Sequence, residues 1–317
     1  MARLLADSAP EPPAGVVVRA PTLDDAPAVA VLIDARNQAD FEEARSIEFS
    51  ADELRALWAG HPERLATDAW VALIGGETVG WGQAQREGDM ANLADESCVH
   101  PDFRGRGIGS HLVALAEAWA RERGFGRLLV HVVTDEGRRL LESRGFENVR
   151  FFWRMVTELH DEPARPEPPP GFAIRRYRPG EDDVGLHAMH QEAFAGHWEF
   201  VPHPLQQWLE WRTERSDYDP ELWQVALAED EIAGAALCFG ARGLGWVLDL
   251  AVGPRFRKCG LGLALLRAGF HELWRHGHTF VGLEVDSENE TGATRLYERA
   301  GMRVTRRYAT FEKRLEA

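Results

Sequence analysis

The sequence predicts an α+β protein built from two tandem domains of the same kind. Two loops with the same arginine and glycine spacing each follow a strand-like segment and precede a helical pattern. Val99 and Gly107 in the first loop stand 153 positions before Val252 and Gly260 in the second. A chain of 317 residues is long enough for two domains with separate cores. The stretch 160–171 between the halves holds five prolines and is expected to be an extended linker.

The order of strands and helices in the first half supports this division. We expect a hairpin over 70–83, because β-forming residues flank the turn at Gly75, and a helix after Ser50, which forms a capping box with Glu53. The other elements expected there are strands at 16–19, 93–99, 128–133 and 152–158, and helices after Thr22, at 112–123 and at 136–143. The first domain is therefore assigned to 15–159, after a flexible tail over 1–14.

The second half, assigned to 172–317, repeats this order. The expected strands are 173–175, 222–228, 232–239, 246–252, 280–285 and 308–313, and the expected helices begin at 181, 204, 261 and 292. The glycines that close the last helix of each half, Gly145 and Gly301, are 156 positions apart. The first half is therefore three residues shorter than the second between its loop and this glycine.

Composition restricts the class of function. The formal net charge of −15 works against nucleic acid or an anionic membrane as the main partner; it suits a cationic substrate such as an amine, although solubility alone also explains it. No apolar run reaches the roughly 18 residues of a membrane span, and the first residues do not resemble a secretory signal. Cys98, Cys238 and Cys259 lack metal-ligand spacing and indicate a reducing compartment. We expect a cytoplasmic protein without a metal site.

Each loop has the chemistry of an anion-binding site. Glycines let a phosphate approach the backbone, and the first N–H groups of the following helix lack partners within the helix. Arg257 and Lys258 add positive charge to the second loop. The loops lack the Gly-Lys-Ser/Thr ending of the Walker motif and the G-x-G-x-x-G dinucleotide fingerprint, so those two nucleotide motifs are excluded.

Both loops match the R/Q-x-x-G-x-G/A pyrophosphate loop of the GNAT superfamily of acyl-CoA-dependent N-acetyltransferases. The chain resembles the tandem two-domain type found in the mycothiol synthase family. This resemblance implies two mostly antiparallel central sheets flanked by helices, with acetyl-CoA as the cofactor. The residues implied to bind coenzyme A are Val99, Arg104, Gly105, Arg106, Gly107, Ile108 and Gly109 in the first half, and Leu250, Ala251, Val252, Arg257, Lys258, Cys259, Gly260, Leu261, Gly262 and Asn289 in the second.

The resemblance assigns catalysis to the second half. Tyr297 occupies the position at which GNAT enzymes typically have a tyrosine that protonates the leaving thiolate of coenzyme A, and the first half has Leu141 there. A phenol suits this role because it keeps its O–H at neutral pH, whereas leucine cannot donate a proton. The first half also lacks an asparagine corresponding to Asn289. We expect a catalytic C-terminal domain and an N-terminal domain that keeps a cofactor-shaped groove.

The expected reaction is a direct attack by an amine, with the backbone N–H of Val252 as the oxyanion donor. The general base is less clear from the sequence, because Trp246 stands where several GNAT enzymes have a glutamate. Asp249 is the nearest acid on the same strand and the first candidate. The alternatives are a structural role for Asp249 beside a neighbouring base, and a water chain to Glu284 or Asp286.

The acceptor is expected to be a small primary amine. His197, Trp198 and Glu199 lie between the first two helices of the second half, which cover the acceptor cleft in GNAT enzymes; a packed aromatic loop is the alternative. The thiol of Cys259 is read as a small filler of the loop. The alternative functions are mycothiol synthase proper and a non-catalytic acyl-CoA sensor. A monomer or a homodimer is expected.

Overall fold

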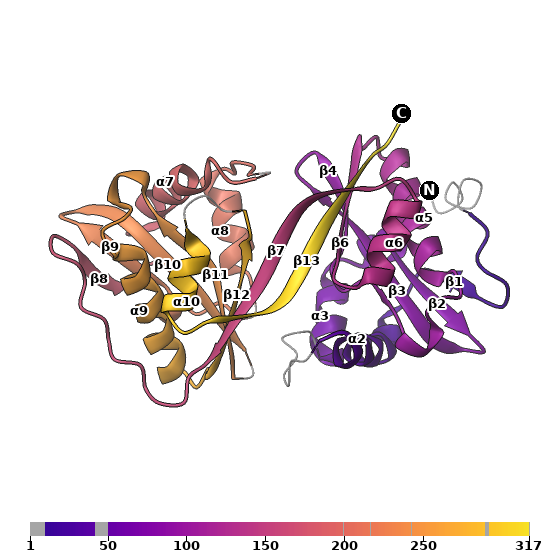
Figure 1. The fold of residues 1–317 in the computed structure, drawn as a ribbon, viewed down its shortest axis with the longest axis horizontal. Coiled ribbons are helices and arrows are strands. Elements are labelled where there is room, and N and C mark those ends of the chain that lie inside the picture. Colours follow the sequence, from indigo (N-terminus) through magenta and orange to yellow (C-terminus); the bar gives the residue numbers. More distant parts are fainter. Residues whose placement is uncertain are drawn as a thin grey trace. The chain divides into compact units, whose positions relative to one another are not determined.

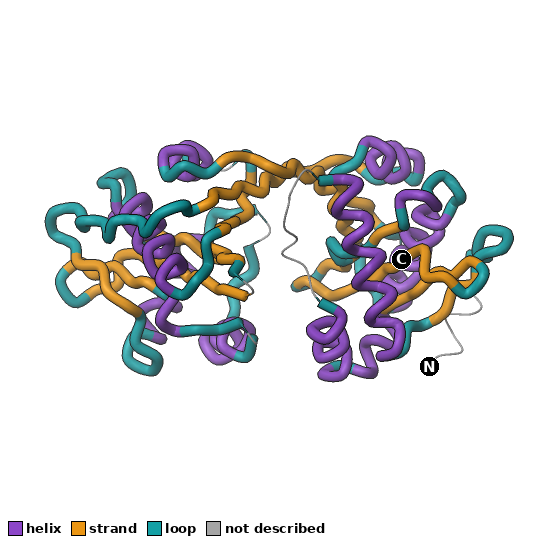
Figure 2. The backbone as a smooth tube through the Cα atoms, turned by 90° about the horizontal axis from the view of Figure 1, so that it is seen from below, coloured by secondary structure: helices purple, strands orange, loops and turns teal. Residues whose placement is uncertain are grey.

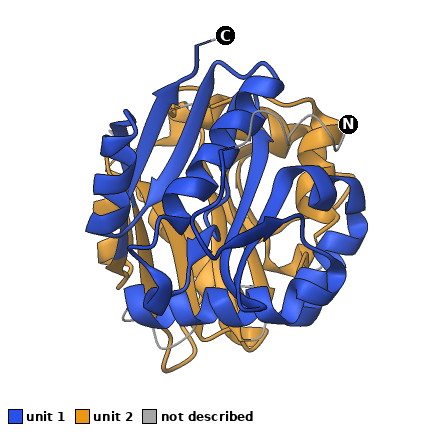
Figure 3. Cartoon of the chain, turned by 90° about the vertical axis from the view of Figure 1, so that its right-hand side faces the viewer, with its two compact units in different colours: residues 1–152, 306–317 blue, residues 153–305 orange. Residues whose placement is uncertain are grey.

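The computed structural model describes residues 10–41, 50–198, 200–215, 217–241, 243–288 and 292–316 (Figure 1). They pack into two units (Figure 3): unit 1 comprises Met1–Phe152 with Arg306–Ala317, and unit 2 comprises Trp153–Thr305. In each unit helices pack against a layer of strands (Figure 2). Among the described residues, no helix is long and apolar enough to span a membrane, and no group of histidine, cysteine and acidic side chains is suited to hold a metal ion.

The chain up to residue 158 forms the first series of elements. Short 3-10 turns at Leu23–Asp25 and Pro101–Phe103 precede α2 and α5. The helices and strands are β1 (Val17–Arg19), α2 (Ala26–Asp40), α3 (Ala51–Gly60), α4 (Pro62–Asp68), β2 (Ala69–Ile74), β3 (Glu77–Glu87), β4 (Met90–Leu93), β5 (Cys98–Val99), α5 (Ile108–Glu122), β6 (Arg127–Val132), α6 (Asp135–Ser143) and β7 (Glu147–Glu158).

The remaining chain forms a second series in a similar order. Short 3-10 turns at Pro220–Leu222 and Pro254–Phe256 precede β9 and α9. The helices and strands are β8 (Ala173–Arg176), α7 (Asp183–Phe194), α8 (Leu205–Thr213), β9 (Gln224–Ala228), β10 (Glu231–Ala241), β11 (Leu244–Val252), α9 (Leu261–Arg275), β12 (Phe280–Asp286), α10 (Ala293–Arg299) and β13 (Arg303–Arg314).

The sheets have the predicted mixed and mostly antiparallel character. In unit 1, β1, β2, β3 and β4 pair antiparallel in that order, and β4 pairs parallel with β6. In unit 2, β8, β9, β10 and β11 pair antiparallel, and β11 pairs parallel with β12. In both units the loop helix lies between the two parallel strands in the chain, because parallel strands need a crossover connection such as a helix. The predicted fold class of two similar tandem α+β units is confirmed.

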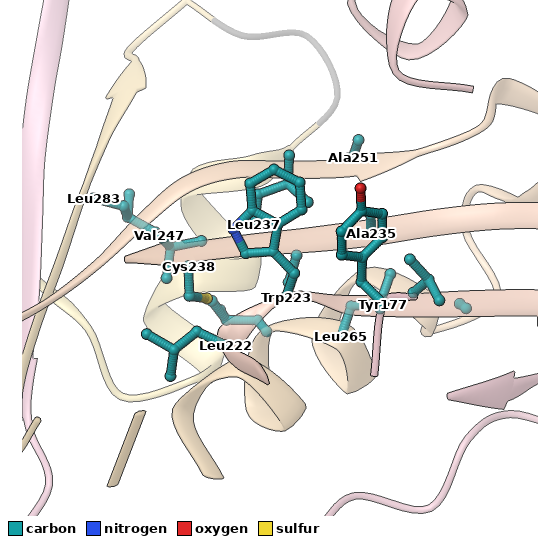
Figure 4. Packing of buried hydrophobic residues seen from close by; sticks show 14 of the residues in the cluster. Tyr177, Leu222, Trp223, Ala235, Leu237, Cys238, Val247, Ala251, Leu265 and Leu283 are labelled. Carbon is teal, nitrogen blue, oxygen red and sulfur yellow. The ribbon is translucent and has the colours of Figure 1, made fainter. Parts of the chain in front are cut away.

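Each sheet is covered by its loop helix. Leu265, Leu266 and Leu273 on α9 recur at helical spacing and are fully buried in the core of unit 2. The packing is close: a Cβ atom on Gly245 of β11 would come within 2.9 Å of Leu273. Figure 4 shows Trp223 among the aliphatic side chains of the same core. The contact between sheet and helix fixes the loop that joins β11 to α9.

The last strand of each half, β7 and β13, makes the boundaries of the two units differ from the predicted domain bounds of 15–159 and 172–317. Residues 309–314 of β13, which belong to unit 1, pair antiparallel with β6, from Ala309 opposite Val132 to Arg314 opposite Arg127. Ala309 and Phe311 are buried in the unit 1 core, whereas Met155 of β7 is buried in the core of unit 2. Each half of the sequence thus donates its last strand to the sheet of the other unit. Equivalent strands at the ends of two repeats look alike in sequence, so the pattern could not reveal this exchange.

Two local features also differ from the sequence reading. The strand predicted at 93–99 is divided into β4 and β5, with a turn between Leu93 and Cys98. The proline-rich linker packs alongside α9. His271 of that helix hydrogen-bonds the Pro163 carbonyl at 2.7 Å, and a Cβ atom on Gly260 would lie 4.0 Å from Pro169. The linker is therefore anchored to the start and the third turn of the loop helix.

Candidate active site

The site in unit 2 begins where two parallel strands separate. The described pairs between β11 and β12 run from Leu244 opposite Phe280 to Trp246 opposite Gly282, and both strands then continue without further parallel pairs among the described residues. On its other edge β11 stays paired with β10 as far as Val252. The edge of β11 over 248–252 that faces away from β10 is thus available to a ligand's polar groups.

A β-bulge changes the direction of the side chains at this point. The register between β10 and β11 shifts between Leu237, opposite Asp249, and Cys238, opposite Val247, so Leu248 is the extra residue and its side chain is 40% exposed. Beyond the bulge, alternation turns Asp249 toward the neighbouring helices α7 and α8, which the contacts described below confirm.

The loop after β11 has the geometry predicted for an anion site. Gly260 is the N-cap of α9 at φ = +90°, and no side chain among the described residues caps the helix, so its first N–H groups can bind a ligand. Lys258 also has positive φ, at +65°. The Arg257 guanidinium donates to the carbonyls of Val252 at 3.1 Å and Ala193 at 2.8 Å. This arginine therefore ties the loop to the end of β11 and to α7.

The other predicted residues of this loop have clear local roles. A Cβ atom on Gly262 would lie 3.0 Å from Leu296, so a glycine lets α9 approach α10. The exposed Cys259 thiol contacts the Phe256 carbonyl at 3.1 Å, as expected of a side chain that fills a turn. Leu261 and Ala251 are buried, and Leu250 packs against the core. Backbone N–H groups, together with the positive charges of Arg257 and Lys258, are therefore what this loop can offer to a phosphate.

The loop in unit 1 has the same backbone but a different arginine environment. Gly105 and Gly107 have φ of +74° and +82°, and Gly107 caps α5 without a side-chain partner. Arg104 binds both carboxylate oxygens of Asp40 at 2.8 and 2.7 Å, and the Asp40 side chain is 7% exposed. Arg106 stacks over Phe103 with its guanidinium carbon 4.8 Å from the ring centre.

A cavity of about 390 Å³ adjoins this unit 1 loop. Its walls include Val99, Ile108 and Gly109, which were predicted to bind coenzyme A, and Leu141, which stands at the position of the tyrosine. Tyr308 also lines it, from the part of β13 that belongs to unit 1. Sequence analysis missed Tyr308 because a residue from the end of the chain joins this wall only through the exchange of closing strands.

The proposed acid Tyr297 lies on α10 with 8% of its surface exposed. Burial, and secondarily the negative charge of Asp249, raises the pKa of the phenol to about 12. The hydroxyl thus stays protonated throughout the neutral range. The electrostatic influence of Asp249 indicates that the two residues lie near each other.

The Asp249 carboxylate is held by two basic side chains. Arg212 of α8 donates to Oδ2 from Nε at 3.1 Å and from Nη2 at 2.9 Å, and His190 Nε2 of α7 lies 3.4 Å from the same oxygen. Burial alone would raise the pKa of this carboxyl group, but the hydrogen bond from His190 and the charge of Arg212 outweigh it and hold the pKa below its usual value. Sequence analysis missed His190 and Arg212, which belong to no motif.

The alternative acids on β12 have partners of their own. Arg154 binds Glu284 through Nε at 3.1 Å and Nη2 at 2.8 Å, and its guanidinium lies over Trp246 at 5.2 Å from the ring centre. Asp286 accepts a hydrogen bond from the Glu288 N–H at 2.9 Å. Trp246, which stands at the position where GNAT enzymes often have an acid, therefore packs against the Arg154–Glu284 ion pair.

The predicted acceptor residues lie after α7. His197 and Trp198 are partly buried, and the His197 ring lies 4.5 Å from Phe194. Burial and the nearby Arg257 lower the pKa of His197, so this ring is neutral at pH 7. Glu199 and Asn289, the other two predicted ligands of unit 2, lie outside the described residues.

Comparison with known proteins identifies the family. The model of the Acetyltransferase (GNAT) family matches residues 33–146 and 184–302. The chain is 32% identical to a mycothiol acetyltransferase of Streptomyces scabiei over 86% of this chain and 87% of that protein. It is 30% identical to a mycothiol acetyltransferase of Salinispora arenicola over 92% of this chain and 94% of that protein.

Solved structures agree with this assignment. A GCN5-related N-acetyltransferase from Sphaerobacter thermophilus superposes with a TM-score of 0.85 at 32% identity, covering 97% of this chain and 98% of that one. A tandem GNAT protein from the clavulanic acid biosynthesis pathway shares the fold, with a TM-score of 0.73 at 20% identity over 95% of this chain and 99% of that one. The chain therefore belongs to the GNAT family and is an acyl-CoA-dependent N-acetyltransferase that uses acetyl-CoA.

Proposed function

We propose that unit 2 transfers the acetyl group of acetyl-CoA to a small primary amine. The observation that carries this proposal is the buried phenol of Tyr297 close to Asp249 in unit 2, where unit 1 has Leu141. Only unit 2 therefore has a proton donor at this position. The acetyl-CoA thioester supplies the activated acyl group.

The chain's own groups divide the remaining work. The N–H groups at the start of α9 and the backbone of residues 257–262 are suited to the pyrophosphate of coenzyme A. The free edge of β11, with the Val252 N–H at its end, is suited to hydrogen-bond the bound chain and to stabilise negative charge on the acyl oxygen. Tyr297 retains its proton at neutral pH and can release it to the departing sulfur. His197, Trp198 and Glu199 are proposed as the walls for the amine, and Asn289 as a further coenzyme A contact.

Unit 1 is proposed to bind an acyl-CoA without turning it over. The cavity against Val99, Ile108 and Gly109 supports binding, and Leu141 offers no acid. Titration calorimetry with acetyl-CoA tests this division. Two binding events in the wild-type protein are expected, and a single event that is unchanged by substitutions in the unit 1 loop would contradict cofactor binding there.

A second candidate acceptor is the one used by mycothiol acetyltransferases. The chain shares over 30% identity with such proteins across most of its length, but Trp246 and its stacked Arg154 stand where the mycothiol synthase family has an acid. The test is mass-spectrometric detection of acetylated products from acetyl-CoA and a panel of amines that includes the amino-sugar acceptor of those enzymes. Turnover of simple amines alone favours the first proposal, turnover of the amino sugar favours the second, and binding without any turnover favours an acyl-CoA sensor.

A further inference from the structure

His190 occupies a buried polar position that the proposed function has not yet used. It lies on the last two turns of α7 with 4% of its surface exposed. Its ring stacks on Phe194 at 4.5 Å and meets Trp208 edge-on at 5.1 Å. The ring is therefore held in one orientation, and only its two nitrogen atoms are left for chemistry.

The nitrogen Nε2 faces a carboxylate. It lies 3.4 Å from Asp249 Oδ2 and 3.5 Å from Arg212 Nη2. Because the Asp249 carboxylate can only accept, the His190 tautomer with its proton on Nε2 donates to Asp249 and leaves a lone pair on Nδ1. Nδ1 is buried and has no hydrogen-bond partner among the described residues. A buried acceptor with no donor is uncommon in native proteins and indicates a missing ligand or water.

The surroundings place His190 beside the reacting groups. Met189 packs toward Gly253, which follows Val252, and Arg257 binds the Ala193 carbonyl one turn further along α7. Protonation of His190 would lower the pKa of His197, the predicted acceptor residue, so the two rings lie near each other. The second half of α7 thus lies against the end of β11 and the phosphate loop.

Asp249 itself is poorly suited to accept the proton. Its carboxylate receives two hydrogen bonds from Arg212 besides the contact with His190. These partners favour the ionised form, so the oxygen atoms hold a proton weakly. Asp249 instead resembles the orienting acid of an acid–histidine pair, which fixes the imidazole tautomer and stabilises its protonated form.

Unit 1 provides an internal comparison. The 153-position offset between the two loops places Asn37 of α2 opposite His190, and the preceding Arg36 donates to the Asp95 carbonyl at 3.4 Å. Both Arg36 and Asp95 line the unit 1 cavity. Arginine stays protonated at any pH a protein tolerates and cannot act as a base, whereas histidine can. Neither Arg36 nor Asn37 can take up a proton near neutral pH as His190 can.

We propose that His190 is the general base that takes the proton of the attacking amine, directly or through one water molecule, and that Asp249 orients it. This inference rests on the proposed acetyl transfer in unit 2. Nδ1 of His190 takes one proton from the ammonium form of the substrate, and the lone pair that this exposes forms the new C–N bond as the C–S bond breaks. The phenol of Tyr297 gives a proton to the sulfur and regains one from the new amide nitrogen. His190 then releases its proton to solvent.

The first test compares His190→Gln with His187→Gln. His187 lies one turn earlier on α7, where its ring contacts the His203 carbonyl away from Asp249. We expect kcat of His190→Gln to fall by about 100-fold or more at pH 7 with little change in acetyl-CoA affinity. We also expect its rate to approach that of the wild type at high pH, where the amine is already neutral. His187→Gln is expected to stay near the wild-type rate.

A loss that persists at high pH would mean that His190 is only a packing residue, and would overturn the assignment. The assignment would also be overturned if His190→Gln kept a rate within a few-fold of the wild type while Tyr297→Phe was impaired. In that case the proposed function would still stand. A wild-type protein that acetylates no amine overturns the proposed function itself. Melting curves and acetyl-CoA titrations of each variant identify any that fail to fold.

The second test does not depend on the stability of His190→Gln. Among the described residues, Asp249, Arg212 and His197 are titratable or charged groups near His190, and Asp249 also acts on Tyr297. Removing the carboxylate in Asp249→Asn takes away the negative charge that favours imidazolium, so the acidic limb of the kcat–pH profile should move to lower pH. A limb that stays in place, or moves to higher pH, would overturn the role of the pair.

Discussion

The two units have the same loop geometry and differ in what surrounds it. In unit 1, the nearly buried carboxylate of Asp40 neutralises Arg104. In unit 2, the hydrogen bonds of the corresponding Arg257 within the described part of the chain go to the backbone carbonyls of Val252 and Ala193, which leave its positive charge uncompensated. Leu141 in unit 1 faces a preformed cavity, and unit 2 has the buried Tyr297 near Asp249 instead. The two units therefore share a loop backbone and differ in the side chains that surround it.

The largest expected effect is on catalysis in unit 2. Tyr297→Phe removes the proposed acid but keeps the ring, so kcat should fall by about 100- to 10,000-fold while acetyl-CoA binding persists. Tyr218→Phe is the matched control, because Tyr218 in the same unit packs edge-on against Trp223. Steady-state kinetics with the best amine measures both. Equal rates for Tyr297→Phe and the wild type would remove the basis for assigning catalysis to this residue.

The next effect separates the two cofactor loops. Gly260 and Gly107 have φ of +90° and +82°, so valine at either position strains the backbone by about 1–3 kcal/mol and distorts the N–H groups that face a phosphate. We expect acetyl-CoA affinity to fall about tenfold or more at the substituted unit only. Calorimetry should then show one binding event lost in each single variant. Loss of both events in one variant would mean that the sites are not independent.

A smaller effect should distinguish the two arginines. Arg104→Ala leaves the carboxylate of Asp40 nearly buried without its bidentate partner and should lower the free energy of unfolding by about 1–3 kcal/mol. Arg257→Ala removes a cation beside the proposed pyrophosphate site and should mainly raise the KM for acetyl-CoA. Chemical denaturation and kinetics on both variants provide the comparison. The reverse pattern would show that Arg104 is the functional cation.

The smallest effect concerns an ion pair near the start of unit 1. Arg19 holds Asp25 through two hydrogen bonds of 2.8 and 2.7 Å and lowers the pKa of Asp25 to about 2. This carboxylate contributes stability above its unfolded pKa near 4, and the contribution is lost as the pH falls through 2. Allowing for solvent screening at the partly exposed Arg19, Asp25→Asn should cost about 1–2 kcal/mol at pH 7. Denaturation midpoints of the two proteins should converge between pH 4 and pH 2; a constant difference would exclude a charge effect.

Local sequence signals predicted the elements and loops well. Ser50 caps α3 and pairs with Glu53 as expected of a capping box, and the hairpin at Gly75 joins β2 to β3. Positive φ at Gly107 and Gly260 follows from a loop that only glycine fits easily. These features depend on residues a few positions apart, so a sequence pattern can specify them. The repeat of the loops at a fixed interval then predicted two domains of one fold, which the family match confirms.

The two-domain class, the two arginine–glycine loops and the contrast between Tyr297 and Leu141 could be read from the sequence alone. Which sheet receives each closing strand, and the approach of Arg212 and His190 to Asp249, depend on the folded structure. Both outcomes depend on pairing between segments far apart in the chain, where any strand or helix of suitable polarity could have been the partner. Local residue preferences select the elements, but the burial of their shared surfaces selects their neighbours.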